Sequence, residues 1–395
     1  MDSKPAPLER SPSPPREAPT EWPEFSPEGD LLEEKAFSWY RKTPENWLTV
    51  QIGQVFQSRY QVLLKLGFGS VSTAWLCRDL QRHKYVTLKV YETGHRQALN
   101  ENKVLQHLHQ VASTSKHQGR NLVRSALDIF ELPGPAGPHL AGGKMPEFLL
   151  KPLLTPILLA LDYLHFVAQV VHTDMQEGNI MLSVPDQSIL DQVVAEEWAS
   201  LSPRKITDGR VIHTSTSLEL PDDPGPPIVT DFGDARIGAG PFIGEVLPDL
   251  YRAPEMILAI PWDEKIDIWA LGLMIWDMFE EKHLFNKRLP SREASAGAHL
   301  ARIISLLGPP PKDLLEKENV TSEFYNDDGT FKLQHQVTET SLEAEEDNLE
   351  GEEQAEFLAF LRKMLRWRPA DSLSAKELLN DPWLQRQVEA EEVED

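Results

Sequence analysis

The sequence predicts an α+β fold in two lobes: a small antiparallel β lobe with one helix, then a larger and mostly helical lobe. Three observations favour this fold class. The chain has 395 residues, which is more than a single hydrophobic core usually serves. Strand-like segments are confined to residues 60–132. From residue 146 onward, apolar residues recur mainly at helical spacing.

The first lobe begins with three predicted strands and a helix. The strands are predicted over residues 60–67, 71–76 and 85–91, with a turn near 79–83. Residues 97–111 follow as a helix whose apolar positions form one stripe. Glu101 lies on that stripe, and an acid on a buried face needs a partner. Lys89, in the third strand, is the available cation; a surface lysine on an edge strand is the alternative.

The second lobe begins with a long apolar helix. Residues 122–132 predict a further strand and residues 146–171 the helix, whose prolines and charges favour burial over a membrane span. Residues 133–145 lie between them, with three prolines and four glycines, so no strand or helix is expected there. Later helices are predicted over residues 266–279, 299–307, 354–365 and 375–379.

These elements suggest a division of the chain into segments. Residues 1–35 are rich in Pro, Ser and Glu, which predicts disorder. The polar stretch at about 184–227 reads as an insertion or a disordered spacer, and the sequence leaves its order open. The predicted segments are an N-terminal extension (36–59), the N-lobe (60–141), the C-lobe with the insert (142–384) and an acidic tail (385–395).

Composition limits the class of partner. The net charge of −23 argues against generic nucleic-acid binding and favours basic partners, although a solvated acidic surface is the simpler interpretation. Cys77 is the single cysteine, so an internal disulfide is excluded and a reducing compartment is expected. The first residues have no apolar core, so no signal peptide is expected.

Three oxygen-bearing side chains, those of Asp174, Asn179 and Asp231, recur at a spacing that indicates a metal and phosphate site. Residues 172–179 read His-Thr-Asp-Met-Gln-Glu-Gly-Asn, and residues 231–233 read Asp-Phe-Gly. This order supplies a carboxylate, Asp174, to orient an attacking hydroxyl, and two ligands for magnesium, Asn179 and Asp231. An Asx-rich turn is the alternative. His172 is more typical of a packed structural histidine, and no zinc site is expected.

A glycine-containing segment lies between the first two strands. Gly67 and Gly69 would let backbone N–H groups approach a phosphate, although an ordinary hairpin turn has the same composition. The predicted nucleotide-binding residues are Leu66, Gly67, Phe68, Gly69, Ser70, Val71, Ser72, Ala74 and Lys89.

Two further motifs are interpreted as holding the fold together. Residues 251–255 read Tyr-Arg-Ala-Pro-Glu, and Asp267 opens an otherwise apolar helix. We expect Asp267 to accept backbone N–H groups of the 172–179 loop. We expect Arg368 to be the buried partner of Glu255.

Residues 65–384 resemble the eukaryotic protein kinases, and among them the serine/arginine-rich protein kinases, particularly the fungal members. The resemblance rests on the 66–76 segment, on His-Thr-Asp in place of His-Arg-Asp, on the insert before Asp231 and on the 368–384 ending. It implies a two-lobed kinase fold, ATP and Mg²⁺, and Asp174, Lys89 and Glu101 as catalytic residues. It also implies arginine/serine-rich protein substrates, a role in mRNA splicing regulation, a monomer without direct nucleic-acid or membrane partners, and a location in cytoplasm and nucleus.

The chain departs from this family at several positions. Family members carry a fifth strand, an adenine-binding hinge and a short helix where this chain has only residues 139–144. Ala74 stands where a valine usually covers the base, Thr87 where an alanine does, and Gln176 where a lysine touches the transferred phosphate. Two alternatives follow: a weakly active pseudokinase that binds basic partners, and a skipped exon near Leu140.

One departure concerns regulation. Thr173 replaces the arginine that usually pairs with a phosphate on the activation segment, and no Ser or Thr lies between Gly233 and Arg252. The sequence therefore predicts an activation segment that is ordered without phosphorylation.

Overall fold

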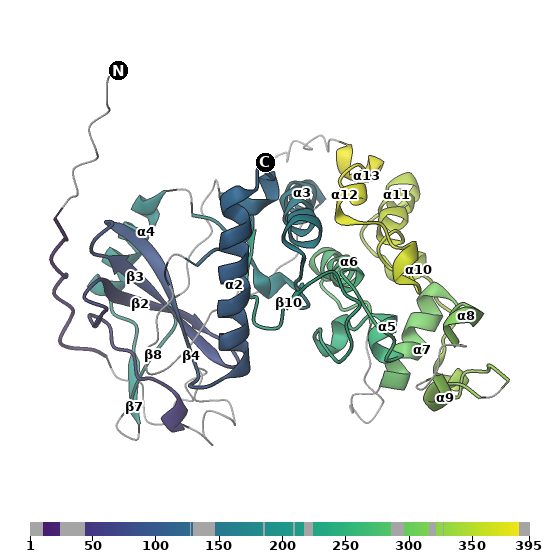
Figure 1. The fold of residues 1–395 in the computed structure, drawn as a ribbon, viewed down its shortest axis with the longest axis horizontal. Coiled ribbons are helices and arrows are strands. Elements are labelled where there is room, and N and C mark those ends of the chain that lie inside the picture. Colours follow the sequence, from purple (N-terminus) through teal and green to yellow (C-terminus); the bar gives the residue numbers. More distant parts are fainter. Residues whose placement is uncertain are drawn as a thin grey trace. The chain divides into compact units, whose positions relative to one another are not determined.

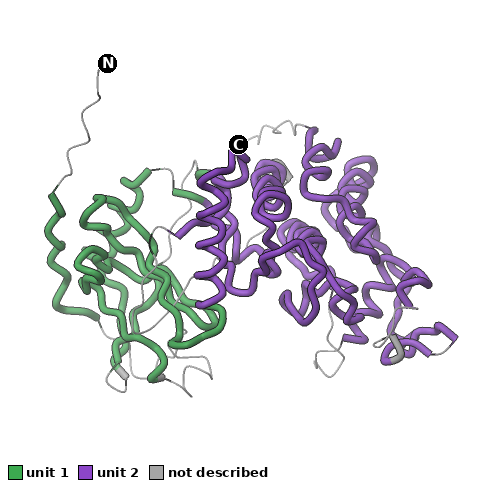
Figure 2. Tube along the Cα trace, in the orientation of Figure 1, with its two compact units in different colours: residues 1–98, 128–139, 183–225 green, residues 99–127, 140–182, 226–395 purple. Residues whose placement is uncertain are grey.

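The computed structural model describes residues 11–23, 44–126, 128, 147–184, 186–207, 210–216, 224–285, 296–315, 321–326 and 328–386. The chain divides into two compact units (Figure 2). Unit 1 comprises residues 1–98, 128–139 and 183–225, and unit 2 comprises residues 99–127, 140–182 and 226–395. The predicted lobe boundaries remain predictions.

Unit 1 is built on a four-stranded antiparallel sheet in the order β1-β2-β3-β4 (Figure 1). The strands are β1 (Val55–Phe56), β2 (Tyr60–Phe68), β3 (Ser72–Asp79) and β4 (Lys84–Tyr91). One side of the sheet buries Val62, Trp75, Cys77 and Val90 in a common core. The register of β2 against β3 shifts twice, and such irregularities bend a strand. This is the small antiparallel sheet that the sequence predicts.

The insert at about 184–227 contributes a helix and a hairpin to unit 1. The elements are α4 (Gln187–Ala199), β7 (Arg204–Thr207) and β8 (Arg210–His213). Helix α4 packs against β2 and β4. Its Val194 is buried with Leu63 and Leu64, and the Trp198 indole N–H donates to the Leu63 carbonyl at 2.9 Å. The described part of the insert is therefore folded and is not a spacer.

Residues 11–23, part of the segment predicted to be disordered, make hydrogen bonds to other residues of unit 1. The backbone N–H of Arg16 donates to Gln61 Oε1 at 2.8 Å, and Gln61 Nε2 donates back to the Arg16 carbonyl at 2.6 Å. The Ser13 N–H donates to the Leu80 carbonyl at 2.8 Å. These contacts are polar, so hydrophobic patterning gives no sign of them. Residues 1–10 and 24–35 lie outside the described residues.

Unit 2 is mostly helical, as predicted (Figure 1). Its helices are most of α2 (Arg96–Thr114), then α3 (Glu147–Asp162), α5 (Pro254–Ile257), α6 (Lys265–Glu280), α7 (Ala296–Leu307), α8 (Lys312–Leu315), α9 (Thr321–Phe324), α10 (Leu342–Glu345), α11 (Gly351–Leu361), α12 (Ala375–Leu378) and α13 (Pro382–Gln385). Helix α6 is buried on nearly every side, so it forms the centre of this unit's core. Two short ladders complete the unit: β5 (Val170–Val171) with β10 (Arg236–Ile237), and β6 (Ile180–Leu182) with β9 (Pro227–Val229).

Helix α3 is a core helix. It continues into a π-helical segment, Tyr163–Ala168. Residues 150–168 are long and apolar enough to cross a membrane by composition, but 61% of the most apolar window is buried inside the protein. Leu154, Leu158 and Leu161 all lie in the main core cluster. This burial agrees with the interpretation of the segment as a buried helix.

The strand predicted over residues 122–132 is wrong for the part that is described. Only Val123 makes a bridge, to Val229, and no strand is formed over residues 122–126. Residues 127 and 129–132 lie outside the described residues. So does the 133–145 segment, including His139–Lys144, and the missing hinge therefore remains a prediction.

Candidate active site

The loop after β5 brings two predicted site residues into direct contact. The Asn179 side-chain nitrogen donates to Asp174 Oδ2 at 2.8 Å and to the Asp174 carbonyl at 2.8 Å. Gln176 Nε2 donates to the other carboxylate oxygen, Oδ1, at 2.8 Å. Both oxygens of Asp174 are thus held by amides. Because Asn179 uses its nitrogen here, its amide oxygen faces away from Asp174.

The carboxylate of Asp174 is poised to take up a proton. Burial raises the pKa of Asp174, and the nearby negative charge of Asp231 raises it further. His172 and the hydrogen bonds from Asn179 and Gln176 oppose that rise but do not reverse it. A carboxylate whose pKa is raised is a better general base than an ordinary one.

Strand pairing carries Asp231 to the same place. Ile180 on β6 pairs with Val229 on β9, and the next residue, Thr230, donates its N–H and its hydroxyl to the Asn179 carbonyl at 2.9 and 3.1 Å. Asp231 follows directly with φ +62°, an uncommon conformation for a residue other than glycine. The structure therefore brings Asp174, Asn179 and Asp231 together in unit 2. Their chemical roles remain predictions.

Asp267 on α6 has the role predicted from the sequence. It is fully buried, and its carboxylate accepts the backbone N–H groups of His172 and Thr173, each at 2.7 Å. His165 Nε2 donates to the same carboxylate at 2.9 Å. The buried helix α6 thus fixes the backbone at the start of the 172–179 loop.

His172 is a packed structural histidine, as expected. Its side chain is fully buried, and Nε2 donates to the Thr230 carbonyl at 2.9 Å. The ring also contacts Phe232 edge to face, with centroids 5.0 Å apart.

Helix α2 holds the Asp-Phe-Gly turn. Glu101 is buried on this helix, as its position on the apolar stripe predicts, and it accepts the Phe232 N–H at 3.3 Å. The adjacent Asn100 donates to the Gly233 and Ala235 carbonyls at 3.0 and 2.9 Å. Glu101 therefore contributes to the position of Asp231 whatever its further role.

The sequence analysis did not identify Arg124, which lies close enough to Glu101 and Asp231 for their charges to act on it. Its Nη1 donates to the Met181 sulfur at 3.5 Å, and its backbone N–H donates to the Val229 carbonyl at 2.9 Å. Burial lowers the pKa of Arg124, while the charges of Glu101 and Asp231 raise it. The sign of it in the sequence was a charged residue, Arg124, within the run of residues 122–132 that otherwise resembles a buried strand.

The glycine-containing segment of unit 1 forms the turn between β2 and β3. Gly67 pairs with Ala74 across the ladder, and the Gly69 N–H donates to the Ser72 carbonyl. Lys89 on β4 lies opposite Ala74, and its ammonium group lies 4.9 Å from the centre of the Tyr91 ring. Lys89 and Glu101 belong to different units, so their ion pair remains a prediction.

The expected pair between Arg368 and Glu255 is wrong. Arg368 is 38% exposed; its Nε donates to Asp313 at 3.0 Å, and its Nη1 lies 3.3 Å from Asp371. Glu255 is 4% exposed and makes no ion pair with Arg368. Burial raises the pKa of Glu255 to about 8. Arg368 precedes a short helical turn, and from there its side chain reaches Asp313 on α8.

The activation segment is held by contacts that use no phosphate. The Leu247 N–H donates to the Thr173 carbonyl at 3.1 Å. Arg252 pairs with Glu245 at 3.0 Å and with Asp249 at 3.2 Å. These contacts are consistent with the predicted order of the segment; its independence from phosphorylation stays a prediction.

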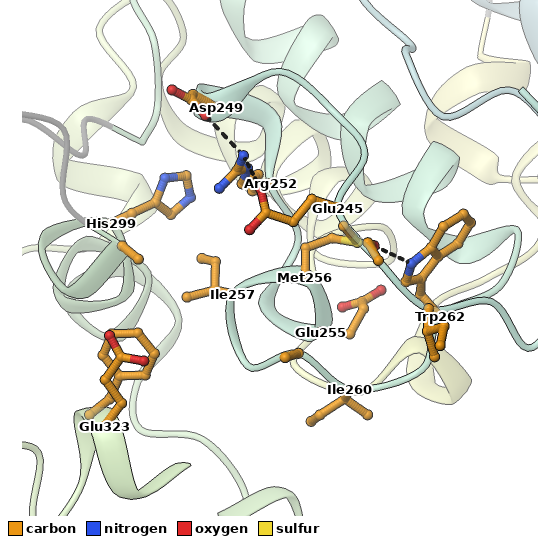
Figure 3. Close-up of a pocket in the computed structure, with 15 residues that line it drawn as sticks. Glu245, Asp249, Arg252, Glu255, Met256, Ile257, Ile260, Trp262, His299 and Glu323 are labelled. Atoms are coloured by element: carbon orange, nitrogen blue, oxygen red, sulfur yellow. Dashed lines mark hydrogen bonds and ion pairs between the residues drawn. The ribbon is translucent and has the colours of Figure 1, made fainter. Parts of the chain in front are cut away.

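A cavity of about 370 Å³ lies beside this segment in unit 2 (Figure 3). Its walls come from the activation segment, α5, the first turn of α7, and α9. Glu245, Asp249 and Glu323 contribute exposed acids to its lining, and Glu255 contributes a buried one.

Comparison with known proteins agrees with this geometry. The family model described as protein kinase domain matches residues 221–384. A serine/threonine protein kinase of Aspergillus fumigatus is 41% identical over 356 residues, covering 85% of this chain and 86% of the relative. The serine/threonine-protein kinase SRPK of Physarum polycephalum is 28% identical, covering 90% and 93%. The crystal structure of a kinase domain shares the fold with a TM-score of 0.63 at 22% identity, covering 86% of this chain and 99% of that one. The chain therefore belongs to the serine/threonine protein kinases, and its similarity to SRPK supports the predicted relation to the serine/arginine-rich protein kinases.

Proposed function

We propose that this kinase transfers the γ-phosphate of ATP to serine hydroxyls of arginine/serine-rich proteins, with Mg²⁺ as its metal ion. The observation that carries the proposal is the convergence of Asp174, Asn179 and Asp231 within unit 2. Phosphoryl transfer depends mainly on positioning and electrostatic stabilisation, and these three side chains supply both.

Asp174 is the proton acceptor in this proposal. The serine oxygen forms a bond to the γ-phosphorus, the bond from that phosphorus to the oxygen shared with the β-phosphate breaks, and ADP leaves with the electron pair. The hydroxyl proton passes to the Asp174 carboxylate. The amides of Asn179 and Gln176 hold that carboxylate in one orientation, and burial gives it the raised pKa that suits this task.

The donor set fits magnesium. Asp231 offers a carboxylate and Asn179 an amide oxygen, which are the hard ligands that Mg²⁺ prefers. The bound ion would neutralise charge on the ATP phosphates. In this proposal Lys89, paired with Glu101, contacts the phosphates, and residues 66–74 cover the nucleotide.

Two observations support arginine-rich substrates. The chain carries a net charge of −23, which favours basic partners. The cavity beside the activation segment is lined by Glu245, Asp249 and Glu323, with Arg252 as the basic residue among its described lining. The resemblance to the serine/arginine-rich protein kinases points to the same substrate class.

A thermal-shift titration with Mg-ATP tests the nucleotide part of the proposal. We expect millimolar Mg-ATP to raise the Tm of the full chain by a few degrees, since a ligand that binds only the folded state stabilises it. Asp231→Ala should lose this shift. Asp347→Ala, at a side chain that is 71% exposed, should keep it. Absence of any shift in the unmodified chain would favour a pseudokinase that does not bind nucleotide.

A phosphate-transfer assay tests the chemistry and the substrate class. Radiolabelled ATP should label an arginine–serine repeat peptide and should label a glutamine–serine repeat peptide far less. Equal labelling of both peptides would contradict the proposed substrate class while leaving the kinase activity intact.

A further inference from the structure

We propose that Ser13 is a phosphorylation site, modified by a proline-directed protein kinase, and that Arg78 and His83 hold its phosphate against unit 1. The proposal goes beyond the proposed function, because here the chain is the substrate of another kinase. It does not depend on the phosphoryl transfer proposed for unit 2.

The sequence around Ser13 suits such a kinase. Residues 13–16 read Ser-Pro-Pro-Arg. The proline directly after the serine favours an extended backbone at the acceptor, because the residue before a proline avoids the helical region. Arg16 adds a positive charge three residues on, which an acidic substrate groove can bind. Ser11 also precedes a proline, but the residue three places after it is Pro14.

The hydroxyl of Ser13 contacts two basic side chains. Its Oγ lies 2.6 Å from His83 Nδ1, and Arg78 Nη2 donates to it at 3.4 Å. The Ser13 N–H donates to the Leu80 carbonyl at 2.8 Å, which holds the backbone against the turn between β3 and β4. A phosphate on Oγ would therefore meet two donors, and one of them is a guanidinium group. Hydrogen bonds between such charged groups are the strong ones.

The surroundings of Ser13 leave room for a phosphate. Arg78 and His83 are only partly buried, so their side chains can move outward by the width of the group. Ser13 itself is partly buried, between the exposed Pro12 and Pro14. The described contacts of Ser13 and Arg16 are hydrogen bonds and one ion pair, not apolar packing. This part of the chain can therefore open locally for the modifying kinase and return.

The hairpin that contacts Ser13 is basic, although the protein is acidic. Residues 78–84 contain one acid, Asp79, and four basic residues: Arg78, Arg82, His83 and Lys84. Arg59 donates to both carboxylate oxygens of Asp79, at 2.9 and 2.6 Å, and so offsets its charge. The chain as a whole carries a net charge of −23. A local excess of positive charge favours a phosphate at this place.

Ser202 provides a contrast within the same unit. Residues 202–205 read Ser-Pro-Arg-Lys, so a basic residue follows this serine at the same spacing. The Ser202 hydroxyl donates to Glu197 Oε2 at 2.9 Å, and its N–H donates to Oε1 at 2.8 Å. A phosphate on Ser202 would face a carboxylate and disrupt these bonds. Of the two serines, Ser13 is the one whose surroundings favour a phosphate.

The modification is a phosphoryl transfer from ATP. Ser13 Oγ forms a bond to the γ-phosphorus, the bond from that phosphorus to the oxygen shared with the β-phosphate breaks, and ADP leaves with the electron pair. The hydroxyl proton passes to the catalytic base of the modifying kinase. The product carries a charge of about −1.5 to −2 at pH 7. It should fasten residues 11–16 to the hairpin and, through the bond from Arg16 to Asp191 at 3.0 Å, to α4.

Site mapping tests the modification. The full chain would be incubated with ATP and a cyclin-dependent kinase, which selects serines that precede a proline, and mass spectrometry would locate the phosphates. We expect Ser13 to be modified faster than Ser11 and Ser202. When the added kinase is omitted, Ser13 should stay unmodified. Absence of phosphate on Ser13, or equal modification without the added kinase, would overturn the proposal.

Proteolysis tests the role of Arg78. Trypsin can cleave after Arg16 only when this residue leaves unit 1, so the cleavage rate tracks the fraction of open chains. We expect phosphorylation of Ser13 to slow this cleavage on the order of tenfold. Arg78→Gln should remove most of the slowing, whereas Arg82→Gln, an equal change of charge at an exposed residue of the same hairpin, should keep it. Equal slowing in the two variants would refute Arg78 as the phosphate's partner.

A spectroscopic measurement on the chain without substitution at Arg78 keeps the test decisive if that variant does not fold. Nearby cations favour the charged form of a phosphate and lower its pKa. A ³¹P NMR titration should therefore give the phosphate on Ser13 a second pKa below the ordinary value of about 6 in the folded chain, and close to that value in urea. Ser13→Ala identifies the signal. The same pKa in the folded chain and in urea would contradict the proposed contacts.

Discussion

Asp267 on α6 accepts the backbone N–H of His172 at 2.7 Å, and so joins a helix that is buried on nearly every side to the first residue of the 172–179 loop. The same carboxylate holds Thr173 and His165. Because one fully buried carboxylate accepts hydrogen bonds from three donors, it holds the backbone at the start of the 172–179 loop in place.

Replacing Asp267 should therefore destabilise the fold strongly. Asp267→Asn turns an acceptor into a donor that faces backbone N–H groups, so we expect a loss of about 3 kcal/mol or more in the free energy of unfolding. Urea denaturation measures this loss. Asp371→Asn, which removes an exposed ion pair with Arg368, should cost under about 1 kcal/mol. Similar losses for the two variants would mean that Asp267 does not anchor the loop.

Asp174→Asn should separate catalysis from stability. If Asp174 accepts the serine proton, kcat should fall by about 10² to 10⁴-fold. Burial raises the pKa of Asp174, so the folded protein disfavours the charged carboxylate at neutral pH. A neutral amide removes that penalty but keeps only one of the two oxygens that accept from Gln176 and Asn179, so any fall in Tm should be small. The measurements are radiolabel transfer to the peptide and thermal unfolding, and an unchanged kcat would exclude the assigned role.

Gln176→Lys should increase activity. Gln176 now donates to Asp174 Oδ1 at 2.8 Å, and the family usually has a lysine there that touches the transferred phosphate. An ammonium group at this place would stabilise charge on that phosphate. We expect kcat to rise on the order of tenfold. Gln176→Met, of similar length and without charge, is the control, and a lysine variant no faster than the methionine variant would speak against this reasoning.

The proximity of Asp174, Asn179 and Asp231 was predictable, because it comes from a short loop and from the pairing of two strands. Asp174 and Asn179 are five residues apart on one loop, and the pairing of Ile180 with Val229 then places Asp231. The buried position of Glu101 was visible as an acid on an apolar stripe.

The partners of several other side chains were not predictable, because the same sequence pattern allows more than one partner. The partner of Arg368 depends on the turn that follows it, and that turn directs the side chain to Asp313. In the insert, Val194 and Trp198 give a weak helical signal, and their partner Leu63 lies far away in sequence. The contact of Arg16 with Gln61 is made by backbone and amide groups, which hydrophobic patterning does not report.

Glu255 should make stability depend on pH in a defined direction. Burial raises its pKa from the ordinary 4.5 to about 8 in the folded protein. Between these two values the folded state binds more protons than the unfolded state, so the free energy of unfolding decreases as pH rises. The slope from this one group is at most about 1.4 kcal/mol per pH unit, and the loss levels off above pH 8.

Glu255→Gln isolates that contribution, because other buried acids, such as Asp174, are present in both proteins. The variant cannot ionise, so the difference in unfolding free energy between variant and unmodified chain should grow in the variant's favour from about pH 5.5 to about pH 8.5. Urea denaturation across this range measures it. Parallel curves for the two proteins would mean that the pKa of Glu255 is not raised in the folded protein.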